Sequence, residues 1–250
     1  MSKIYLGVPT YDGQIHYGVH RSIVSASAQP GNITSAFVQS SALTRGFNML
    51  WCAALDGGFD YFVMLHADIE VRTKRWLDIL LEQLGTADVI SAASPLKDAS
   101  GLTSTGIERI DPEAQPHTIE LRQPRRLTLR ELADLPSTFT AAEVATVFGL
   151  PGWTQHRLVV NTGCLVVRLD RDWTKQLVWT DGDAIIQTDG GRHVVFIPED
   201  WQFSRTAQML GADVLATKAV EIVHHGTSVW SSWANYGQER DEEYFRRGGV

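Results

Sequence analysis

The sequence has 250 residues, 44% of them hydrophobic and 20% charged, which is typical of a globular chain that buries one large core. Its 22 Lys and Arg residues against 29 Asp and Glu residues leave a net charge of −7, so the chain as a whole is not drawn to nucleic acid. Because no apolar run approaches the roughly 20 residues that cross a bilayer and no secretory signal pattern is evident, we expect a cytoplasmic protein without a membrane span.

The chain begins with a short apolar run, Ile4 to Val8, which predicts a buried strand. The residues that follow it, Pro9-Thr10-Tyr11-Asp12-Gly13, are typical of a turn. Ligands of open α/β sheets bind where the carboxyl ends of the strands open. We therefore expect this turn to lie at a ligand site.

A helix and a second strand are predicted next. Apolar residues recur at helical spacing from about Ser40 to Leu55, and Arg45 and Asn48 lie on another face of this helix. Residues 61–65 predict a buried strand that ends directly before His66-Ala67-Asp68-Ile69-Glu70, and a further helix is expected from about residue 74 to residue 84. This alternation predicts a mostly parallel central sheet flanked by helices.

The regular alternation breaks down over residues 97–157, where we expect a helical and loop insertion. Two capping-box spacings, Thr128 with Glu131 and Thr140 with Glu143, predict the starts of two helices there. A stretch of this length inside a compact domain usually forms a lid or a partner surface, or is mobile.

Strand-like runs return after the insertion, and the last of them ends at two histidines. These runs cover residues 158–160, 164–169, 193–197 and 219–223. A helix is expected to begin at Glu199-Asp200 and to end at Gly211, and His224-His225-Gly226 follow the last strand. The pattern predicts a single α/β domain over residues 1–226 and an unassigned C-terminal tail over residues 227–250.

Asp68 is the strongest candidate for a metal ligand. A carboxylate at the end of a rigid strand suits Mn²⁺ or Mg²⁺, and such a cation neutralises a diphosphate leaving group as its bond breaks. Either His66 or Glu70 would share the cation, because alternate residues of an extended segment point the same way. As an isolated string, however, His-Ala-Asp is more often a plain strand-end cap.

Two further pairs of residues are candidates for chemistry. At a helix start, Glu199 and Asp200 either cap free amides, which is worth roughly 0.5 to 2 kcal/mol, or place a carboxylate at an acceptor hydroxyl as general base. A histidine at a strand end is usually a polar edge residue. Of His224 and His225, however, one is expected to turn inward onto a metal and the other to face solvent, since neighbouring side chains of a strand alternate.

In their order and spacing these motifs resemble the glycosyltransferase A-type (GT-A) superfamily, in particular its compact family-2-like bacterial and phage members, over about two thirds of the chain. The matching stretches are Pro9-Thr10-Tyr11-Asp12, Arg45-Gly46-Phe47-Asn48, Gly57-Gly58-Phe59-Asp60-Tyr61, His66-Ala67-Asp68, residues 161–168, Glu199-Asp200-Trp201-Gln202-Phe203 with Arg205 and Gly211, and His224-His225-Gly226. The resemblance implies a Rossmann-like GT-A domain that transfers a sugar from a nucleotide-sugar, with a uridine diphosphate (UDP) sugar as the expected donor.

The resemblance also implies roles for individual residues. Those expected to hold the donor are Pro9, Thr10, Tyr11, Asp12, Arg45, Asn48, His66 and Ala67. Asp68 would bind Mn²⁺ or Mg²⁺, His224 would complete the metal shell, and Glu70 is a further candidate ligand. Asp200, or else Glu199, would be the base. His66 stands where the family usually has an aspartate, which removes a negative charge from the metal site.

The acceptor and the stereochemistry stay open at this stage. The acceptor is a saccharide, a small molecule or, as in similar phage enzymes, a hydroxymethylated DNA base, for which Arg122, Arg125 and Arg126 would contact phosphates. Both inversion and retention are compatible with the residue pattern.

Two other classes of function remain as alternatives. A nucleotidyltransferase usually has a glycine-rich loop with a basic residue, which Gly7-Val8-Pro9-Thr10-Tyr11 lacks. The second alternative is a non-catalytic nucleotide or glycan binder, for which the histidine at position 66 is the only hint.

Overall fold

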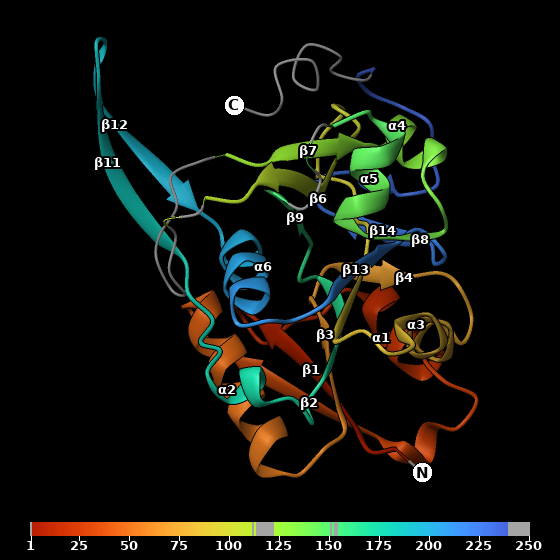
Figure 1. Cartoon of the computed structure of the whole chain (residues 1–250). Helices are drawn as coiled ribbons and strands as arrows, with labels where there is room; N and C mark the ends of the chain where they lie inside the picture. Colours follow the sequence, from red (N-terminus) through yellow and green to blue (C-terminus); the bar gives the residue numbers. More distant parts are fainter. Residues whose placement is uncertain (1, 112, 114–122, 151, 153–154, 240–250) are drawn as a thin grey trace.

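A mixed seven-stranded sheet lies at the centre of the molecule, with the strand order β2-β1-β3-β10-β5-β13-β8 (Figure 1). The structure is a computed structural model that describes residues 2–111, 113, 123–150, 152 and 155–239. The strands of the central sheet are β1 (Ile4–Thr10), β2 (Ile33–Gln39), β3 (Tyr61–Leu65), β5 (Val89–Ala92), β8 (Thr138–Phe139), β10 (Cys164–Arg168) and β13 (Val214–Thr217). The prediction of an α/β chain is confirmed.

The strands of this sheet do not all run in one direction. β1 is parallel to both β2 and β3, and β5 is parallel to β13. β10 is antiparallel to both of its neighbours, β3 and β5, and β8 is antiparallel to β13. The sheet is therefore mixed, with β10 and β8 opposite in direction to the other strands.

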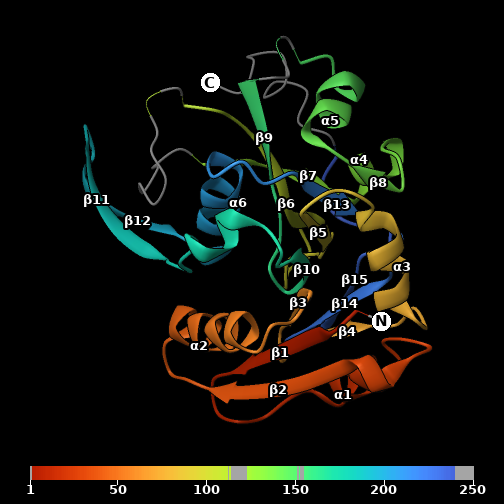
Figure 2. The same cartoon turned by 60° about the horizontal axis from the view of Figure 1, so that its bottom comes forward.

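The central strands are buried on both faces, which explains why they read as continuous apolar runs. In β3, Phe62 and Met64 belong to one hydrophobic cluster, whereas Val63 and Leu65 belong to another. Because strand side chains alternate, the two clusters lie on opposite faces of the sheet. α2 (Leu43–Asp56) contributes to the first cluster together with helices later in the chain, and α1 (Tyr17–Val24) and α3 (Trp76–Leu84) contribute to the second (Figure 2).

The stretch from residue 97 to residue 157 contains strands as well as the two predicted helices. Its elements are β6 (Leu102–Arg109), β7 (Arg125–Thr128), α4 (Leu129–Asp134), β8, α5 (Ala141–Val147) and the start of β9 (His156–Val159). β7, β6 and β9 pair in that order as a separate sheet. Both helices begin with the expected capping boxes, at Thr128 and Thr140. The helical and loop insertion of the prediction is thus corrected to one that contains a sheet.

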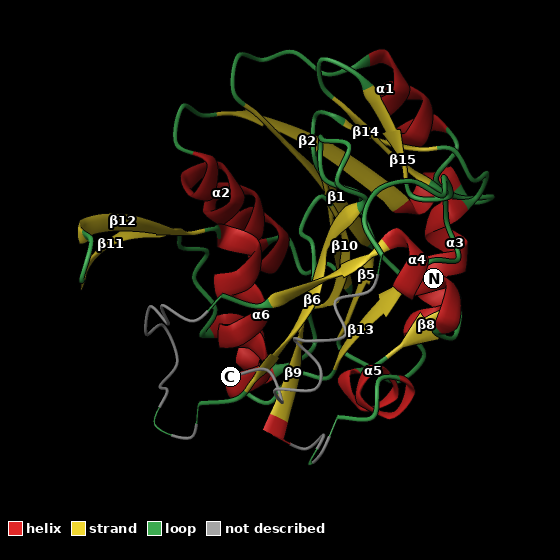
Figure 3. Cartoon of the chain, turned by 90° about the horizontal axis from the view of Figure 1, so that it is seen from above, coloured by secondary structure: helices red, strands yellow, loops and turns green. Residues whose placement is uncertain are grey.

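A β-hairpin projects from the body of the molecule and leads into the last helix. It consists of β11 (Gly182–Thr188) and β12 (Gly191–Ile197), which are antiparallel. β12 continues through Pro198 into α6 (Glu199–Met209), whose start agrees with the prediction. Seen from above, the hairpin and α6 lie on the side of α2, away from α1 and α3 (Figure 3).

A small sheet brings the C-terminal histidines beside the segment that follows β3. It contains β4 (Ile69–Val71), β14 (Ile222–His225) and β15 (Val229–Ser231), in the order β15-β14-β4. The last strand predicted, over residues 219–223, is therefore displaced, and both histidines belong to β14. In the part of the chain that the structure describes, no helix is long and apolar enough to cross a membrane.

Candidate functional site

Asp68 lies in the turn between β3 and β4, next to β14. His225 N donates a hydrogen bond to Asp68 O over 2.9 Å. This backbone contact sets the register that turns His224 toward Asp68, with Nε2 3.8 Å from the carboxylate Oδ1. The ammonium of Lys97 forms an ion pair with the other carboxylate oxygen, Oδ2. Asp68, His224 and Lys97 are called the Asp68 group below.

The ionised form of Asp68 is favoured by its neighbours. Burial opposes ionisation, but His66, Lys97 and His224 outweigh it and hold the pKa of Asp68 below its usual value. The carboxylate is therefore a fixed negative charge at neutral pH.

The ring of His224 is oriented as a metal ligand would be. Nδ1 lies 2.8 Å from the carbonyl oxygen of Pro95, and since a carbonyl only accepts, the proton is assigned to Nδ1. Burial lowers the pKa of His224, so the ring is neutral and Nε2 presents a lone pair toward Asp68. Metal-bound histidines commonly donate their other N–H to a carbonyl in this way.

Asp68 and His224 thus fit a divalent cation as two of its ligands. Among the residues that the structure describes, no group of three or more His, Cys, Asp and Glu side chains is arranged to hold a metal. Mg²⁺ and similar cations often take few protein ligands and complete their shell with substrate phosphates and water. A diphosphate would therefore have to supply part of the shell here.

Glu70 does not lie with Asp68, so its expected place in the metal shell is corrected. The rule of alternate residues applies to extended segments, whereas Ala67 and Asp68 form a turn. Glu70 accepts a hydrogen bond from Arg21 Nη2 over 2.6 Å, and its Oε2 lies 2.9 Å from His225 Nε2.

His225 does not face solvent, contrary to the expectation. Its side chain is 12% exposed, and its ring stacks on His16 with centroids 3.6 Å apart. Alternation along β14 therefore turns the two histidines to two different carboxylates, His224 to Asp68 and His225 to Glu70.

His66 connects the Asp68 group to the rest of the site. Burial lowers the pKa of His66 to about 4, so its imidazole is neutral at neutral pH. Its ring packs against Phe47, with centroids 5.2 Å apart, and Nε2 lies 3.5 Å from Thr162 Oγ1. The Thr162 hydroxyl also donates to Glu199 Oε1 over 3.3 Å. A chain of polar contacts thus runs from β3 to the start of α6.

A second carboxylate group lies at the start of α6 and consists of Glu199 and Asp200, with Arg126 nearby. Burial, followed by the charge of Glu199, raises the pKa of Asp200 to about 7, although Arg126 acts in the opposite direction. Burial also raises the pKa of Glu199. A carboxyl group that titrates near neutral pH can take up a proton during a reaction and release it afterwards. We call these residues the Asp200 group.

A buried ionic network holds α6 in place. Arg205 of α6 donates to both carboxylate oxygens of Glu108 in β6, over 2.9 and 2.6 Å. Arg157 of β9 forms a further ion pair with Glu108, and the three side chains are at most 2% exposed. The β7-β6-β9 sheet therefore positions the helix that carries Asp200.

The predicted basic cluster is not a free surface. Arg125 is 5% exposed and forms two hydrogen bonds with Glu131, of 2.8 and 2.6 Å. The guanidinium of Arg126 lies 4.8 Å from the ring centroid of Trp201, and Arg122 lies outside the described residues. The expected contact of Arg125 with DNA phosphates is therefore corrected, because Glu131 already neutralises its charge.

The end of β1 lies beside the end of β3, since Gly7 pairs with Met64 in the parallel ladder, and His16 N, beyond the turn after β1, donates to Ala67 O over 2.9 Å. Four residues predicted to contact the donor lie in this region. Pro9 and Thr10 are buried at the end of β1, whereas Tyr11 and Asp12 are exposed. The turn thus offers an open surface next to the Asp68 group.

Asn48 has a structural contact where a donor contact was expected. Its Nδ2 donates to Trp179 O over 2.9 Å, and its Oδ1 accepts from Trp179 N over 3.0 Å. Trp179 in turn stacks on Phe203 of α6, with centroids 4.4 Å apart. Both halves of the Asn48 amide are thus used to hold a backbone segment under α6. Arg45 is exposed in the first turn of α2.

Sequence reasoning misses Lys97 and Thr162. Lys97 is 29 residues from Asp68 and stands in the stretch assigned to the insertion, so no local pattern connects the two. Thr162 belongs to the matched stretch of residues 161–168, but its neighbours in the sequence do not show that its hydroxyl lies between His66 and Glu199.

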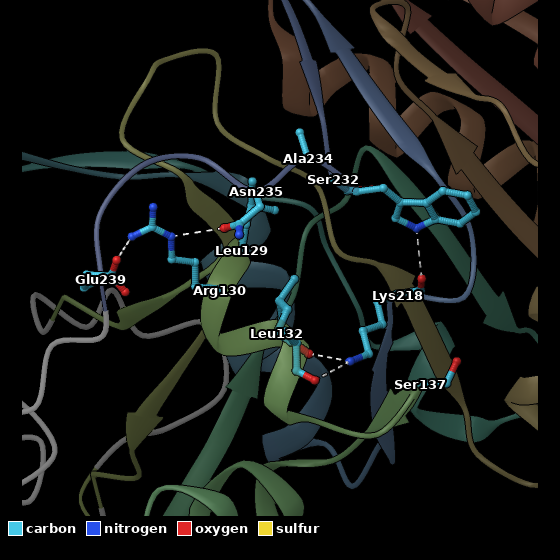
Figure 4. A pocket seen from close by; sticks show the side chains of 11 residues that line it. Leu129, Arg130, Leu132, Ser137, Lys218, Ser232, Ala234, Asn235 and Glu239 are labelled. Carbon is cyan, nitrogen blue, oxygen red and sulfur yellow. Dashed lines mark hydrogen bonds and ion pairs between the residues drawn. The ribbon is translucent and has the colours of Figure 1, made fainter.

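A cavity of about 800 Å³ opens elsewhere, between α4 and the C-terminal tail (Figure 4). Arg130, Lys218 and Trp233 are among its lining residues. Lys218 Nζ donates to Leu132 O over 2.5 Å, Trp233 Nε1 donates to Lys218 O over 3.3 Å, and Arg130 pairs with Glu239. These polar groups have partners within the protein, and no residue of the two carboxylate groups lines the cavity.

Comparisons with known proteins do not place the chain in a family. No protein-family model matches the sequence, and no curated protein matches it either. Among the solved structures that are similar to it are the following two. They are A197 from STIV, with 8% identity over 95% of this chain and 98% of that chain and a TM-score of 0.49, and HddC from Yersinia pseudotuberculosis, with 10% identity over 90% and 73% and a TM-score of 0.32. With so few identical residues and such modest TM-scores, neither protein informs on the activity of this chain.

Proposed function

We propose that the chain is a glycosyltransferase of GT-A type that moves a sugar from a nucleoside diphosphate sugar, with UDP as the expected nucleotide, to a hydroxyl acceptor. The observation that supports this function best is the pair of aspartates with opposite environments, Asp68 and Asp200. His66, beside Asp68, contacts Thr162, and Thr162 contacts Glu199, the neighbour of Asp200. Enzymes give different tasks to two such carboxylates, because one stays ionised while the other exchanges a proton near neutral pH.

Asp200 acts at the acceptor end of the reaction. The acceptor oxygen forms a bond to the anomeric carbon of the sugar while its proton passes to Asp200. The bond between that carbon and the phosphate oxygen breaks, and its electron pair leaves with the nucleoside diphosphate. Arg126 beside Asp200 favours the ionised carboxylate that accepts the proton. This direct displacement inverts the configuration at the anomeric carbon.

Asp68 and His224 act at the diphosphate end. They would hold Mn²⁺ or Mg²⁺, and the cation would neutralise the charge that develops on the leaving diphosphate. Asp68 contributes a fixed negative charge, and His224 contributes the lone pair that its hydrogen bond to Pro95 leaves free. The turn of residues 9–12 would meet the nucleoside, because it follows β1, which pairs with β3 directly before His66-Ala67-Asp68.

The acceptor is a saccharide or another small hydroxyl compound. A hydroxymethylated DNA base is less well supported, because Arg125 is already paired with Glu131 and the net charge is −7. Phosphate contacts normally come from cationic side chains that are free to reach the backbone of DNA.

The proposal is tested by incubating the protein with Mn²⁺ and a panel of nucleotide-sugars and measuring the nucleoside diphosphate released. We expect release of UDP from at least one UDP-sugar, and release about 10²- to 10⁴-fold slower from the Asp200→Asn variant. Release of pyrophosphate from a nucleoside triphosphate and a sugar phosphate would instead indicate a nucleotidyltransferase. Binding of nucleotide-sugars without any release would indicate a non-catalytic binder.

A further inference from the structure

The contacts of Lys97 place its side chain in the candidate site, although no sequence motif identifies this residue. It lies two residues after Pro95, whose carbonyl contacts the His224 ring, so one loop contributes to both partners of Asp68. The ammonium of Lys97 pairs with Asp68 Oδ2, while the side chains of Lys97 and Asp68 are 41% and 38% exposed. The pair is thus open to solvent and to an incoming ligand.

The protein makes room for the Lys97 side chain. A Cβ added to Gly226 would lie 3.2 Å from Lys97 Cδ and 3.6 Å from Cγ, so the glycine lets the aliphatic stem lie along the backbone after β14. Two backbone hydrogen bonds hold the loop that contains Lys97. Leu96 N donates to Leu102 O over 2.9 Å, and Gln238 N donates to Ser100 O over 2.6 Å. These contacts hold the backbone of the loop whose Lys97 ammonium pairs with Asp68.

The ammonium lies at the carboxylate that the proposed cation needs. Two positive charges side by side repel each other, so Lys97 and a divalent cation compete for Asp68. A diphosphate is a stronger partner for an ammonium than one carboxylate, because it presents more charge and more acceptor oxygens.

We propose that Lys97 is an internal counter-ion that couples binding of the metal to binding of the donor. Without donor, its ammonium neutralises Asp68 and weakens binding of a divalent cation. When the donor binds, Lys97 turns to the diphosphate and leaves Asp68 free for the cation. This inference rests on the proposed function, and it adds that cation and nucleoside diphosphate each raise the affinity for the other, as linkage requires.

Calorimetric titration of Mn²⁺ into the protein, with and without saturating UDP, tests the coupling in wild type and in Lys97→Met. In wild type we expect UDP to tighten Mn²⁺ binding about tenfold or more. Lys97→Met removes the ammonium and keeps an aliphatic stem, so Mn²⁺ should bind about tenfold more tightly than to wild type in the absence of UDP. UDP should then tighten Mn²⁺ binding much less than in wild type.

Two further variants make the result specific. Lys97→Arg keeps the positive charge and should retain the coupling. Lys175→Met removes another lysine that pairs with an aspartate, Asp172, over 3.2 Å, and it should behave as wild type. UDP titrated with a chelator present should bind more weakly to Lys97→Met than to Lys175→Met, because the first variant lacks a cation for the diphosphate.

The outcomes separate the inference from the function on which it rests. If wild type binds Mn²⁺ and UDP but Lys97→Met shows the same Mn²⁺ affinity and the same coupling, the role of Lys97 is wrong and the proposed function stands. Weaker Mn²⁺ binding by Lys97→Met in the absence of UDP would also overturn the inference. If wild type binds neither ligand, both proposals fail.

Discussion

The Asp68 group and the Asp200 group place the same kind of side chain in two different environments. Asp68 is 38% exposed in a turn, and two neighbours from distant parts of the chain, Lys97 and His224, favour its charge. Asp200 is 7% exposed in the first turn of α6, and both burial and Glu199 disfavour its charge. The pKa of Asp68 is therefore lowered, whereas that of Asp200 is raised to about 7.

This difference shows that position in the fold, and not residue type, assigns the task. A carboxylate that is always ionised suits contact with a cation, because it does not lose its charge when the pH changes. A carboxyl group with a pKa near 7 suits proton transfer, because both of its forms are accessible at neutral pH. Each of the following predictions tests one side of this contrast.

The largest effect is expected for Asp200→Asn. Removal of a positioned base typically lowers the rate by about 10²- to 10⁴-fold, so kcat for sugar transfer should fall by that order. Asparagine has the same shape as aspartate, and the circular dichroism spectrum should not change.

The matched control for this variant is Asp172→Asn, since Asp172 is a fully exposed aspartate outside the site. It should have the activity of wild type in the same assay. A fall of less than tenfold for Asp200→Asn would show that Asp200 is not the base, and Glu199→Gln would then be measured next.

The second effect concerns the network that positions the Asp200 group. Glu108→Ala removes the carboxylate that Arg157 and Arg205 share in the core. Breaking a buried ion pair by removal of one partner costs about 3 to 5 kcal/mol, and urea denaturation should show a loss of this size in the free energy of unfolding.

The corresponding change in an exposed ion pair, Asp172→Ala, should leave the denaturation midpoint nearly unchanged. If Glu108→Ala is as stable as Asp172→Ala, the network does not hold α6. The Asp200 group would then be no more rigid than the Asp68 group.

Those structural features of the molecule that depend on local sequence patterns are predicted from the sequence. The buried run of β3 and the start of α6 at Glu199 follow from periodicity, and the caps at Thr128 and Thr140 follow from spacing. Such signals depend on residues a few positions apart.

The features that the sequence does not predict depend on contacts between segments that are distant in the chain. The reversed direction of β10 and the ion pair of Lys97 with Asp68 arise from tertiary packing. The prediction that Glu70 lies beside Asp68 requires an extended segment. The turn at Ala67 and Asp68 instead directs the Glu70 side chain to Arg21 and His225. Local periodicity carries no information about such partners.

The third effect distinguishes the two histidines of β14. His224→Ala should weaken Mn²⁺ binding, in the presence of UDP, by about 10- to 100-fold, as is typical when support around a metal is lost. His225→Ala should leave Mn²⁺ binding unchanged but lower the melting temperature, because His225 contacts Glu70 and His16 in a partly buried cluster. The reverse order in the Mn²⁺ titration would contradict the assignment of His224.

The smallest effect is a pH dependence of stability that has opposite signs for the two aspartates. The Asp200 carboxyl has a pKa near 3.8 in the unfolded chain but about 7 in the folded one, so the folded state binds more protons between these values. The contribution of this carboxyl to stability therefore falls as the pH rises from about 4 to about 7. Asp200→Asn lacks this carboxyl, and its melting temperature relative to wild type should rise over that range and then level off.

Asp68→Asn should show the opposite sign, because its carboxylate is stabilised in the folded chain. At neutral pH the variant should be less stable than wild type, by at most about 1 kcal/mol, since the ion pair with Lys97 is partly exposed. The Asp68 contribution is lost only as the pH falls below about 3.8, so melting curves of both variants in the same buffers, from about pH 2 to about pH 8, give the comparison. If both variants are destabilised at pH 8, the raised pKa of Asp200 is wrong. The two aspartates would then differ in exposure but not in protonation state. The proposed division of tasks depends on that difference in protonation.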